Sequence, residues 1–256
     1  MEALSTGNCA RFAAKPLTHS GIPAPVWLAG FNQEPLPPLD LTGCPGLVVV
    51  AAHPDDETLG LGGTIAQLVE SGVDVKVVSV SDGGAALPNA TSTGRIRMAV
   101  TRQHELRRAT GILGVTSPMS LRLPDGQLTD YEERITDSLV EILDATAEPP
   151  WCAATWRGDG HPDHEVVGRA AANACARTNA TLLEFPIWMW HWATPADSVV
   201  PWDRAYSVPT PHWAALRKRR AAQCFRSQFE PNAGSPPVLP PFVLPRMMAV
   251  GEVVFR

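Results

Sequence analysis

The chain has 256 residues, of which 45% are hydrophobic and 18% are charged, and its formal net charge is −5. This length suits one large domain or two small ones, and the composition is that of a compact protein with a buried core. The acidic balance argues against a nucleic-acid partner, because the short basic run at residues 217–220 is typical of a solvated helix face.

Residues 1–45 are rich in proline and poor in periodicity, with Pro35, Pro37 and Pro38 close together. We expect an N-terminal arm that lies over the domain without building its core. The first twenty residues lack the apolar block of a secretory signal, and the longest aliphatic stretch, residues 47–52, is too short to cross a bilayer. Five scattered cysteines indicate reduced thiols, so we expect a cytoplasmic protein without a membrane span.

Residues 46–256 predict a single α/β domain that includes the C-terminal tail. The expected strands are residues 47–50, 75–80, 120–123, 152–156 and 181–185, and the expected helices are residues 63–70, 97–113, 131–147 and 163–177. This alternation predicts a Rossmann-like, mostly parallel sheet with helices on both faces. In the tail we expect an ordered segment or lid over residues 231–245 and one edge strand over residues 250–255.

Two clusters of histidine and aspartate follow predicted strands. Residues 53–57 read His-Pro-Asp-Asp-Glu directly after the first strand, and residues 161–164 read His-Pro-Asp-His after the fourth. Ligands of such sheets bind beyond the carboxyl ends of the strands, so both clusters are expected at the site. A single His-Pro-Asp is also common as a helix-capping turn, but two copies packed with histidine and aspartate favour a functional interpretation.

These side chains contain the groups needed for metal-assisted amide hydrolysis. Imidazoles and carboxylates suit a divalent first-row metal, and three protein ligands with an open position are typical of catalytic zinc. His53 and Asp56 can reach one ion, and His164 can join them from the other loop. Asp55 is then free to act as a base, while His161 can donate to the oxyanion or the leaving amine, oriented by Asp163.

The two motifs resemble those of the PIG-L/LmbE family of zinc-dependent N-acetylglucosaminyl deacetylases. Weaker similarities lie at residues 102–106 running into 111–115, at residues 123–126, and at residues 218–228, which end in Ser-Gln. The resemblance implies metal ligands at His53, Asp56 and His164, a general base at Asp55, an electrophile at His161 and a supporting residue at Asp163. It also implies substrate contacts for Arg102 and Asp125, although Arg102 could instead pair with Glu105 on its own helix.

Two departures from the family pattern leave the substrate open. Some sugar deacetylases of this family carry a tyrosine two residues before the second motif, where this chain has Asp159. The loop at residues 81–84 also lacks an expected glutamate.

A cluster of tryptophans follows the last predicted strand. Trp188, Trp190 and Trp192 alternate, so in an extended segment their rings would share a face suited to a sugar ring or an aromatic aglycone. The alternative is packing in the core or at a subunit interface. We take Trp190 as a candidate substrate contact, together with His191, although a lone histidine is more often structural.

The sequence therefore predicts a zinc-dependent hydrolase, with Fe²⁺ as an alternative metal, that removes an N-acetyl or other N-acyl group. The expected partner is a sugar-containing small-molecule conjugate of the N-acetylglucosaminyl type, such as a glycosylated natural product. The alternatives are a metal-dependent hydrolase of a non-sugar amide or of a phosphoester, and a non-catalytic zinc protein. A nucleotide-binding module, suggested by the glycines of residues 60–63, is disfavoured because polar residues fill the preceding turn.

Overall fold

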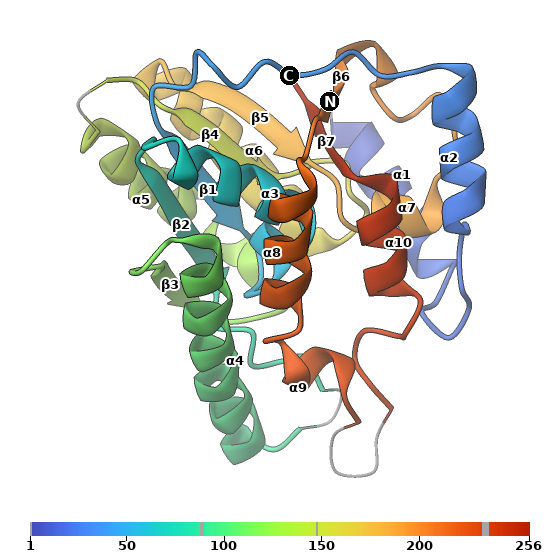
Figure 1. Cartoon of the computed structure of the whole chain (residues 1–256). Coiled ribbons are helices and arrows are strands. Elements are labelled where there is room, and N and C mark those ends of the chain that lie inside the picture. Colours follow the sequence, from blue (N-terminus) through green and yellow to red (C-terminus); the bar gives the residue numbers. More distant parts are fainter. Residues whose placement is uncertain (1, 88–89, 147, 232–235) are drawn as a thin grey trace.

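The computed structural model describes residues 2–87, 90–146, 148–231 and 236–256. A seven-stranded sheet lies at its centre with helices on both faces, which confirms the predicted α/β class (Figure 1). Across the sheet, the strands are β3 (Met119–Leu123), β2 (Val75–Ser81), β1 (Leu47–Ala51), β4 (Trp151–Thr155), β5 (Thr181–Phe185), β7 (Glu252–Phe255) and β6 (Ala205–Val208). The pairs from β3 to β5 are parallel, whereas β7 is antiparallel to both of its neighbours.

The helices agree with the predicted ones, with shifted ends and several additions. They are α1 (Glu2–Ala13), α2 (Ala24–Gln33), α3 (Asp56–Glu70), α4 (Ser92–Leu113), α5 (Glu132–Asp144), α6 (Pro162–Thr178), α7 (Met189–Trp192), α8 (His212–Ala222), α9 (Arg226–Phe229) and α10 (Val243–Val250), with 3-10 turns η1 (Leu128–Tyr131) and η2 (Trp202–Arg204). Among the described residues, none of these helices is long and apolar enough to cross a membrane.

Alternating side chains of the strands build a core on each face of the sheet. Val49 of β1 packs in the cluster that contains residues of α3, α4 and α8. Val48 and Val50 point the other way, into the cluster that contains residues of α5 and α6. Because successive strand residues face opposite sides, continuous apolar runs are needed where helices cover both faces.

The order in which successive strands are added to the sheet reverses between β1 and β4. Strands β2 and β3 lie on one side of β1, and the chain then crosses back so that β4 lies on the other side. In open parallel sheets, this switch point creates a crevice at the carboxyl ends of the two central strands. The loop after β1 and the loop after β4 are the two that carry the His-Pro-Asp motifs.

The N-terminal segment contributes to the core, contrary to our expectation for residues 1–45. Trp27 of α2 is completely buried, its indole Nε1 donates to the Trp190 carbonyl at 3.1 Å, and the two rings meet edge to face at 4.9 Å. Because the segment is rich in proline, the apolar helix α2 was not predicted. The indole ring of its Trp27 is buried among residues of the main domain.

The C-terminal end of the chain also differs from expectation. Residues 252–255 form β7, which is not an edge strand but lies between β5 and β6. Strand β6 (Ala205–Val208), which was not predicted, takes the edge position. Within residues 231–245, residues 232–235 lie outside the described part of the chain.

Helix α3 starts at Asp56, seven residues before the predicted start, and bends at Leu61 (φ −130°, ψ 20°). Beyond the bend, the backbone N–H groups of Gly63 and Thr64 donate to the Glu252 carboxylate at 2.7 and 2.8 Å. The Lys218 Nζ of α8 lies 2.8 Å from the same carboxylate. The C-terminal strand therefore caps the second half of the helix whose first turn carries Asp56.

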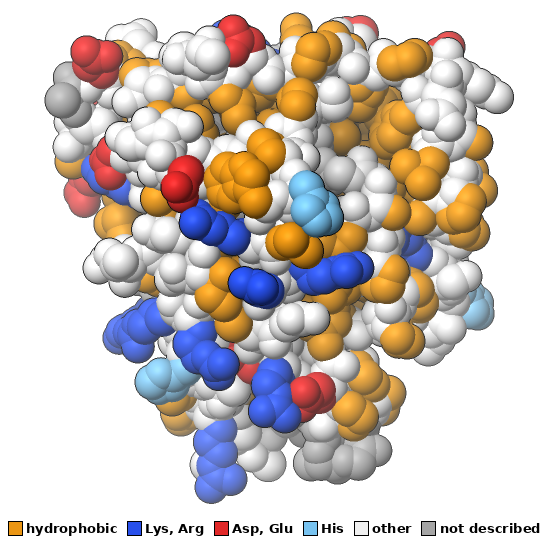
Figure 2. Space-filling view, viewed as in Figure 1, with side chains coloured by type: hydrophobic (Ala, Val, Ile, Leu, Met, Phe, Trp, Pro, Cys, Tyr) orange, Lys and Arg blue, Asp and Glu red, His pale blue; other side chains and the backbone are white. Residues whose placement is uncertain are grey.

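The basic run at residues 217–220 is only partly solvated. Arg219 and Arg220 of α8 are exposed, as expected. Figure 2 shows many Lys and Arg side chains over the region of α4 and α8. Lys218 is 3% exposed and is directed into the protein toward Glu252. A charged run in the sequence does not reveal that one of its members has a buried partner.

We predict that Lys218→Met lowers the free energy of unfolding by about 3–5 kcal/mol, because it leaves the Glu252 carboxylate buried without its countercharge. The matched control is Arg217→Met, which removes a pair with Glu70 of 2.9 Å whose side chains are 38% and 59% exposed. The control should cost at most about 1 kcal/mol. Equal losses for the two variants in urea denaturation would contradict the buried pair as the stabilising contact.

Candidate metal centre and catalytic site

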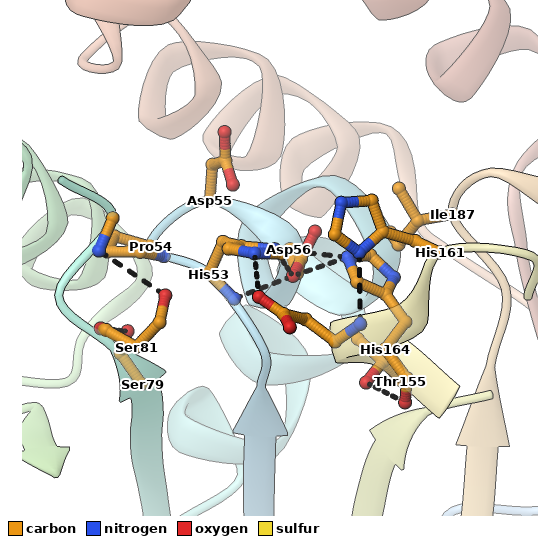
Figure 3. A network of polar contacts seen from close by, with 12 residues as sticks. His53, Pro54, Asp55, Asp56, Ser79, Ser81, Thr155, His161, His164 and Ile187 are labelled. Atoms are coloured by element: carbon orange, nitrogen blue, oxygen red, sulfur yellow. Dashed lines mark hydrogen bonds and ion pairs between the residues drawn. The ribbon is translucent and has the colours of Figure 1, made fainter. Parts of the chain in front are cut away.

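The two motifs meet above the ends of β1 and β4, as the sequence predicts (Figure 3). His53 lies in the loop after β1, and Asp56 begins α3. His161 caps the N-terminus of α6, and His164 lies in the first turn of that helix. Both helices begin at the crevice, so their first turns direct side chains toward one another.

Three ligand atoms form a compact triangle at the centre of the site. The Nδ1 of His53 lies 3.2 Å from the Nε2 of His164. The Oδ2 of Asp56 lies 3.5 Å from the first nitrogen and 3.3 Å from the second. The predicted ligand set of His53, Asp56 and His164 is thus brought together, and all three side chains are largely shielded from solvent.

In each of the two imidazole rings, the nitrogen that points away from the triangle contacts a carboxylate, and these contacts indicate what the triangle can bind. The Nε2 of His53 lies 3.1 Å from Asp125 and 3.2 Å from Asp163, while the Nδ1 of His164 lies 2.9 Å from Asp159. Ionised carboxylates only accept hydrogen bonds, so each ring donates outward, and in its neutral form it presents a lone pair to the other ring. Two facing lone pairs beside a carboxylate fit a divalent cation, and carboxylates behind the rings are the usual outer partners of metal-binding histidines.

The histidines and the aspartate of the triangle stabilise each other's charged forms. Although burial disfavours its charged form, the histidines His164 and His53 lower the pKa of Asp56 to about 2. Burial likewise disfavours a charged His53, but Asp125, Asp163 and Asp56 hold its pKa well above the ordinary value. The pocket therefore favours positive charge at its centre.

Asp55 lies beside the triangle, at the N-cap of α3, with a φ of 138°. Its Oδ1 accepts from the Nη2 of Arg102 at 3.1 Å, and its backbone N–H donates to Glu57 at 3.0 Å. Burial raises the pKa of Asp55 to about 7, against the lowering effect of Arg102. Its carboxylate points away from the three ligand side chains in Figure 3, so it is free to contact a substrate or water.

Arg102 does not pair with Glu105, so the alternative of an ion pair within α4 is wrong. Its Nη2 also donates to the Pro54 carbonyl at 2.7 Å, whereas Glu105 accepts from the backbone and hydroxyl of Ser227. The two weaker resemblances at residues 102–106 and 218–228 therefore meet in space. The buried Nε of Arg102 has no hydrogen-bond partner among the described residues, and the Arg102 residue lines the cavity.

His161 is held as a neutral ring. Burial, followed by His164 and His53, lowers its pKa to about 3. Its Nδ1 accepts the backbone N–H of Asp163 at 3.2 Å, which leaves the proton of the neutral ring on Nε2. His161 lines the cavity and presents a donor there.

The carboxylate of Asp163 does not orient His161, which corrects the role that we expected for it. It contacts His53 and accepts backbone N–H groups of Gly126 and Leu128 at 2.8 and 3.1 Å. Asp125 similarly contacts His53 and accepts from the Ala85 backbone at 2.8 Å. Both aspartates therefore position His53, a candidate metal ligand, and Asp125 in addition lines the cavity.

Asp159 is the main site residue that the sequence analysis missed. It is fully buried, and besides His164 its carboxylate accepts three backbone N–H groups, from Ile187, Trp188 and Met189, at 2.9–3.0 Å. Its position in the loop just before the second motif was the available indication. The sequence shows it only as a departure from tyrosine, because its partners come from a segment almost thirty residues later.

The tryptophan segment is helical, not extended, so the three rings do not share a face. Trp190 is 2% exposed in the core, and the Nε2 of His191 donates to the Lys15 carbonyl at 2.9 Å. Neither residue lines the cavity, which corrects the expectation that they contact substrate. Trp188, at the start of the helix, does line the cavity. The alternation of tryptophans in the sequence does not indicate which of the three rings reaches the cavity.

A cavity of about 330 Å³ opens over this cluster. Its polar part contains His53, Asp55, Asp56, Arg102, Asp125 and His161. This volume falls in the range of small-molecule sites, and the polar groups lie together as a functional site requires. The site can therefore hold a divalent metal beside a carboxylate base and a neutral histidine donor.

Comparison with known proteins agrees with this geometry. The family model of PIG-L, the GlcNAc-PI de-N-acetylase, matches residues 48–175, which are half of the chain. A diacetylchitobiose deacetylase of Thermococcus kodakarensis is 30% identical over 128 residues, covering 48% of this chain and 46% of that protein. A 1D-myo-inositol 2-acetamido-2-deoxy-alpha-D-glucopyranoside deacetylase of Saccharopolyspora erythraea is 30% identical over 217 residues, covering 68% and 69%.

A solved structure shows the same fold. The N,N'-diacetylchitobiose deacetylase of Pyrococcus horikoshii superposes with a TM-score of 0.59 at 24% identity, over 75% of this chain and 74% of that one. The chain spans only about half the length of several curated relatives, such as 46% of the Thermococcus protein. From the matched motifs and the shared fold, this chain belongs to the PIG-L family of deacetylases.

Proposed function

We propose that this protein is a zinc-dependent hydrolase that removes the N-acetyl group from an N-acetylglucosamine-type sugar conjugate. The observation that carries this proposal is the convergence of the His53, Asp56 and His164 triangle with Asp55 and His161 at one cavity. The relatives named above, which are deacetylases of acetylated amino sugars, support the reaction class.

The donor set supports zinc among the divalent metals. Two imidazole nitrogens and one carboxylate oxygen form a three-ligand site that leaves a position for water or substrate, the arrangement of catalytic zinc. Fe²⁺ accepts the same donors and is the alternative. A metal bound there would polarise the amide carbonyl and make a water molecule acidic near neutral pH.

Asp55 is the general base in this proposal. Its carboxylate takes the proton from the attacking water, for which a pKa near the working pH is suited. Arg102 and the backbone bond to Glu57 hold the carboxylate in place. The substrate carbonyl must then lie between Asp55 and His161, which line the same cavity.

His161 supplies a hydrogen-bond donor. As a neutral ring with its proton on Nε2, it donates a hydrogen bond to the oxyanion of the tetrahedral intermediate, and Asp55 delivers to the leaving amine the proton that it took from the water. The backbone N–H of Asp163 donates to the Nδ1 of His161 at 3.2 Å and so fixes this tautomer. Asp163 and Asp125 act one step further away, by orienting His53.

Phosphoester hydrolysis on the same site is disfavoured. Two-metal phosphoesterases need two ligand sets about 4 Å apart. Among the described residues, the second possible metal-binding group, His53, His161 and Asp163, shares His53 with the first. The carboxylates of Asp55 and Asp125 at the cavity would also repel a phosphate.

We predict that Asp55→Asn lowers acetate release from N-acetylglucosaminyl conjugates by about 10²–10⁴-fold, because it removes the proton acceptor but keeps the shape. The matched control is Asp130→Asn, an exposed aspartate outside the cavity, which should retain wild-type release. Bound zinc, measured by atomic emission, should be unchanged in both. Undiminished release by the Asp55 variant would exclude it as the base, and no release by zinc-loaded wild type would refute the proposed function.

We also predict that Asp159→Asn weakens zinc binding about 10–100-fold in competition with a chromophoric chelator, because the amide nitrogen that replaces one oxygen cannot accept from His164. Circular dichroism should show a folded protein, since the remaining oxygen can still accept the backbone N–H groups. Asp130→Asn again serves as the control. Unchanged zinc affinity would show that Asp159 holds only the backbone at residues 187–189.

A further inference from the structure

The cavity over the metal centre has two chemically different parts. Its polar floor is formed by the site residues described above and by Gln228. Its walls are largely apolar and consist of Phe12, Leu17, Leu59, Ile187, Trp188, Val238, Leu239 and Val243. Sugar hydroxyl groups need hydrogen-bond partners, and of these wall side chains only the Trp188 indole offers one.

The N-terminal part of the wall is firmly attached to the site. The Phe12 ring lies 5.2 Å from the Trp188 ring and 6.3 Å from the His161 ring, measured between centroids. The Asn8 side chain of α1 donates to the Gly158 carbonyl at 2.9 Å, and Lys15 donates to the Trp192 carbonyl at 2.8 Å. Helix α1 is thus anchored to the loop and the helix that surround the catalytic histidine.

The C-terminal part of the wall is anchored in a similar way. The backbone N–H of Leu239 donates to the Gln228 carbonyl at 2.8 Å, and Val243 begins α10. Phe12, Leu239 and Val243 all lie outside residues 48–175, where the family model matches. Segments from both ends of the chain therefore cover the family's metal site with a surface of their own.

We propose that this wall is a recognition site for an apolar substituent of the substrate, next to the amide that is cleaved. The inference rests on the proposed function, because it assumes that the sugar and its amide occupy the polar floor. Burying apolar groups against Phe12, Trp188 and Leu239 is favourable, whereas an unsubstituted polar sugar would leave the wall uncovered. The substituent is either an acyl chain longer than acetyl or the group attached to the sugar, and the experiment separates these sources.

Calorimetric titration of the zinc-loaded protein tests the proposal without relying on turnover. One arm uses alkyl glucosaminides from methyl to octyl, and the other uses methyl glucosaminides with N-acyl chains from acetyl to octanoyl, with the Asp55→Asn protein to prevent hydrolysis. Affinity should rise about fourfold for each methylene group that is buried. A rise in the first arm assigns the wall to the attached group, and a rise in the second assigns it to the acyl chain.

Phe12→Ala should reduce the rise in affinity per methylene in whichever arm shows it, and Leu28→Ala of the same N-terminal segment should not. Leu28 is 41% exposed on α2 and does not line the cavity. Affinity that is independent of chain length in both arms, or a rise that survives Phe12→Ala, would overturn the inference. Chain-length-dependent binding without acetate release from any conjugate would instead refute the proposed function.

Discussion

The parallel pairing of β1 with β4 is the constraint on which the site depends. Leu47 pairs with Trp151 and Val50 with Ala154, so the two strands end at the same level of the sheet. Their loops enter one crevice, where α3 and α6 begin with their first turns facing each other. Ligand atoms that are more than a hundred residues apart in sequence consequently lie 3.2 Å apart. Among the described residues, both groups of side chains that could hold a metal ion draw on the two motifs together.

The site keeps several carboxylates buried close together, and each of them has partners that compensate its charge. Asp163, Asp125 and Asp159 accept backbone N–H groups in addition to their contacts with the ligand histidines. Asp55 instead pairs with Arg102. Buried charges are costly unless they are paired and hydrogen-bonded, so this density of acidic groups indicates a site organised around a cation.

The ends of the chain complete the site from outside the family region. Glu252 of β7 and Lys218 of α8 support the bend of α3 one turn beyond Asp56. Gly60, just before the bend, has no room for a side chain, because a Cβ atom there would lie 2.4 Å from the Phe185 ring. Helix α1 and the segment before α10 then form the apolar walls above the metal centre. The terminal segments thus influence both the position of the ligands and the surface offered to substrate.

The sequence by itself determined the order of strands and main helices from β1 to β5, the two motifs and the three candidate ligand residues, because these follow from local periodicity and from residue chemistry at strand ends. Tertiary structure alone decided that Asp163 orients His53, that Asp159 supports His164 and that Arg102 reaches Asp55. It also decided that Trp190 is buried in the core and that β7 lies inside the sheet. Except for the contact of Asp159 with His164, five residues away, these outcomes depend on contacts between distant segments. Local side-chain patterns carry no information about which distant partner a residue will meet.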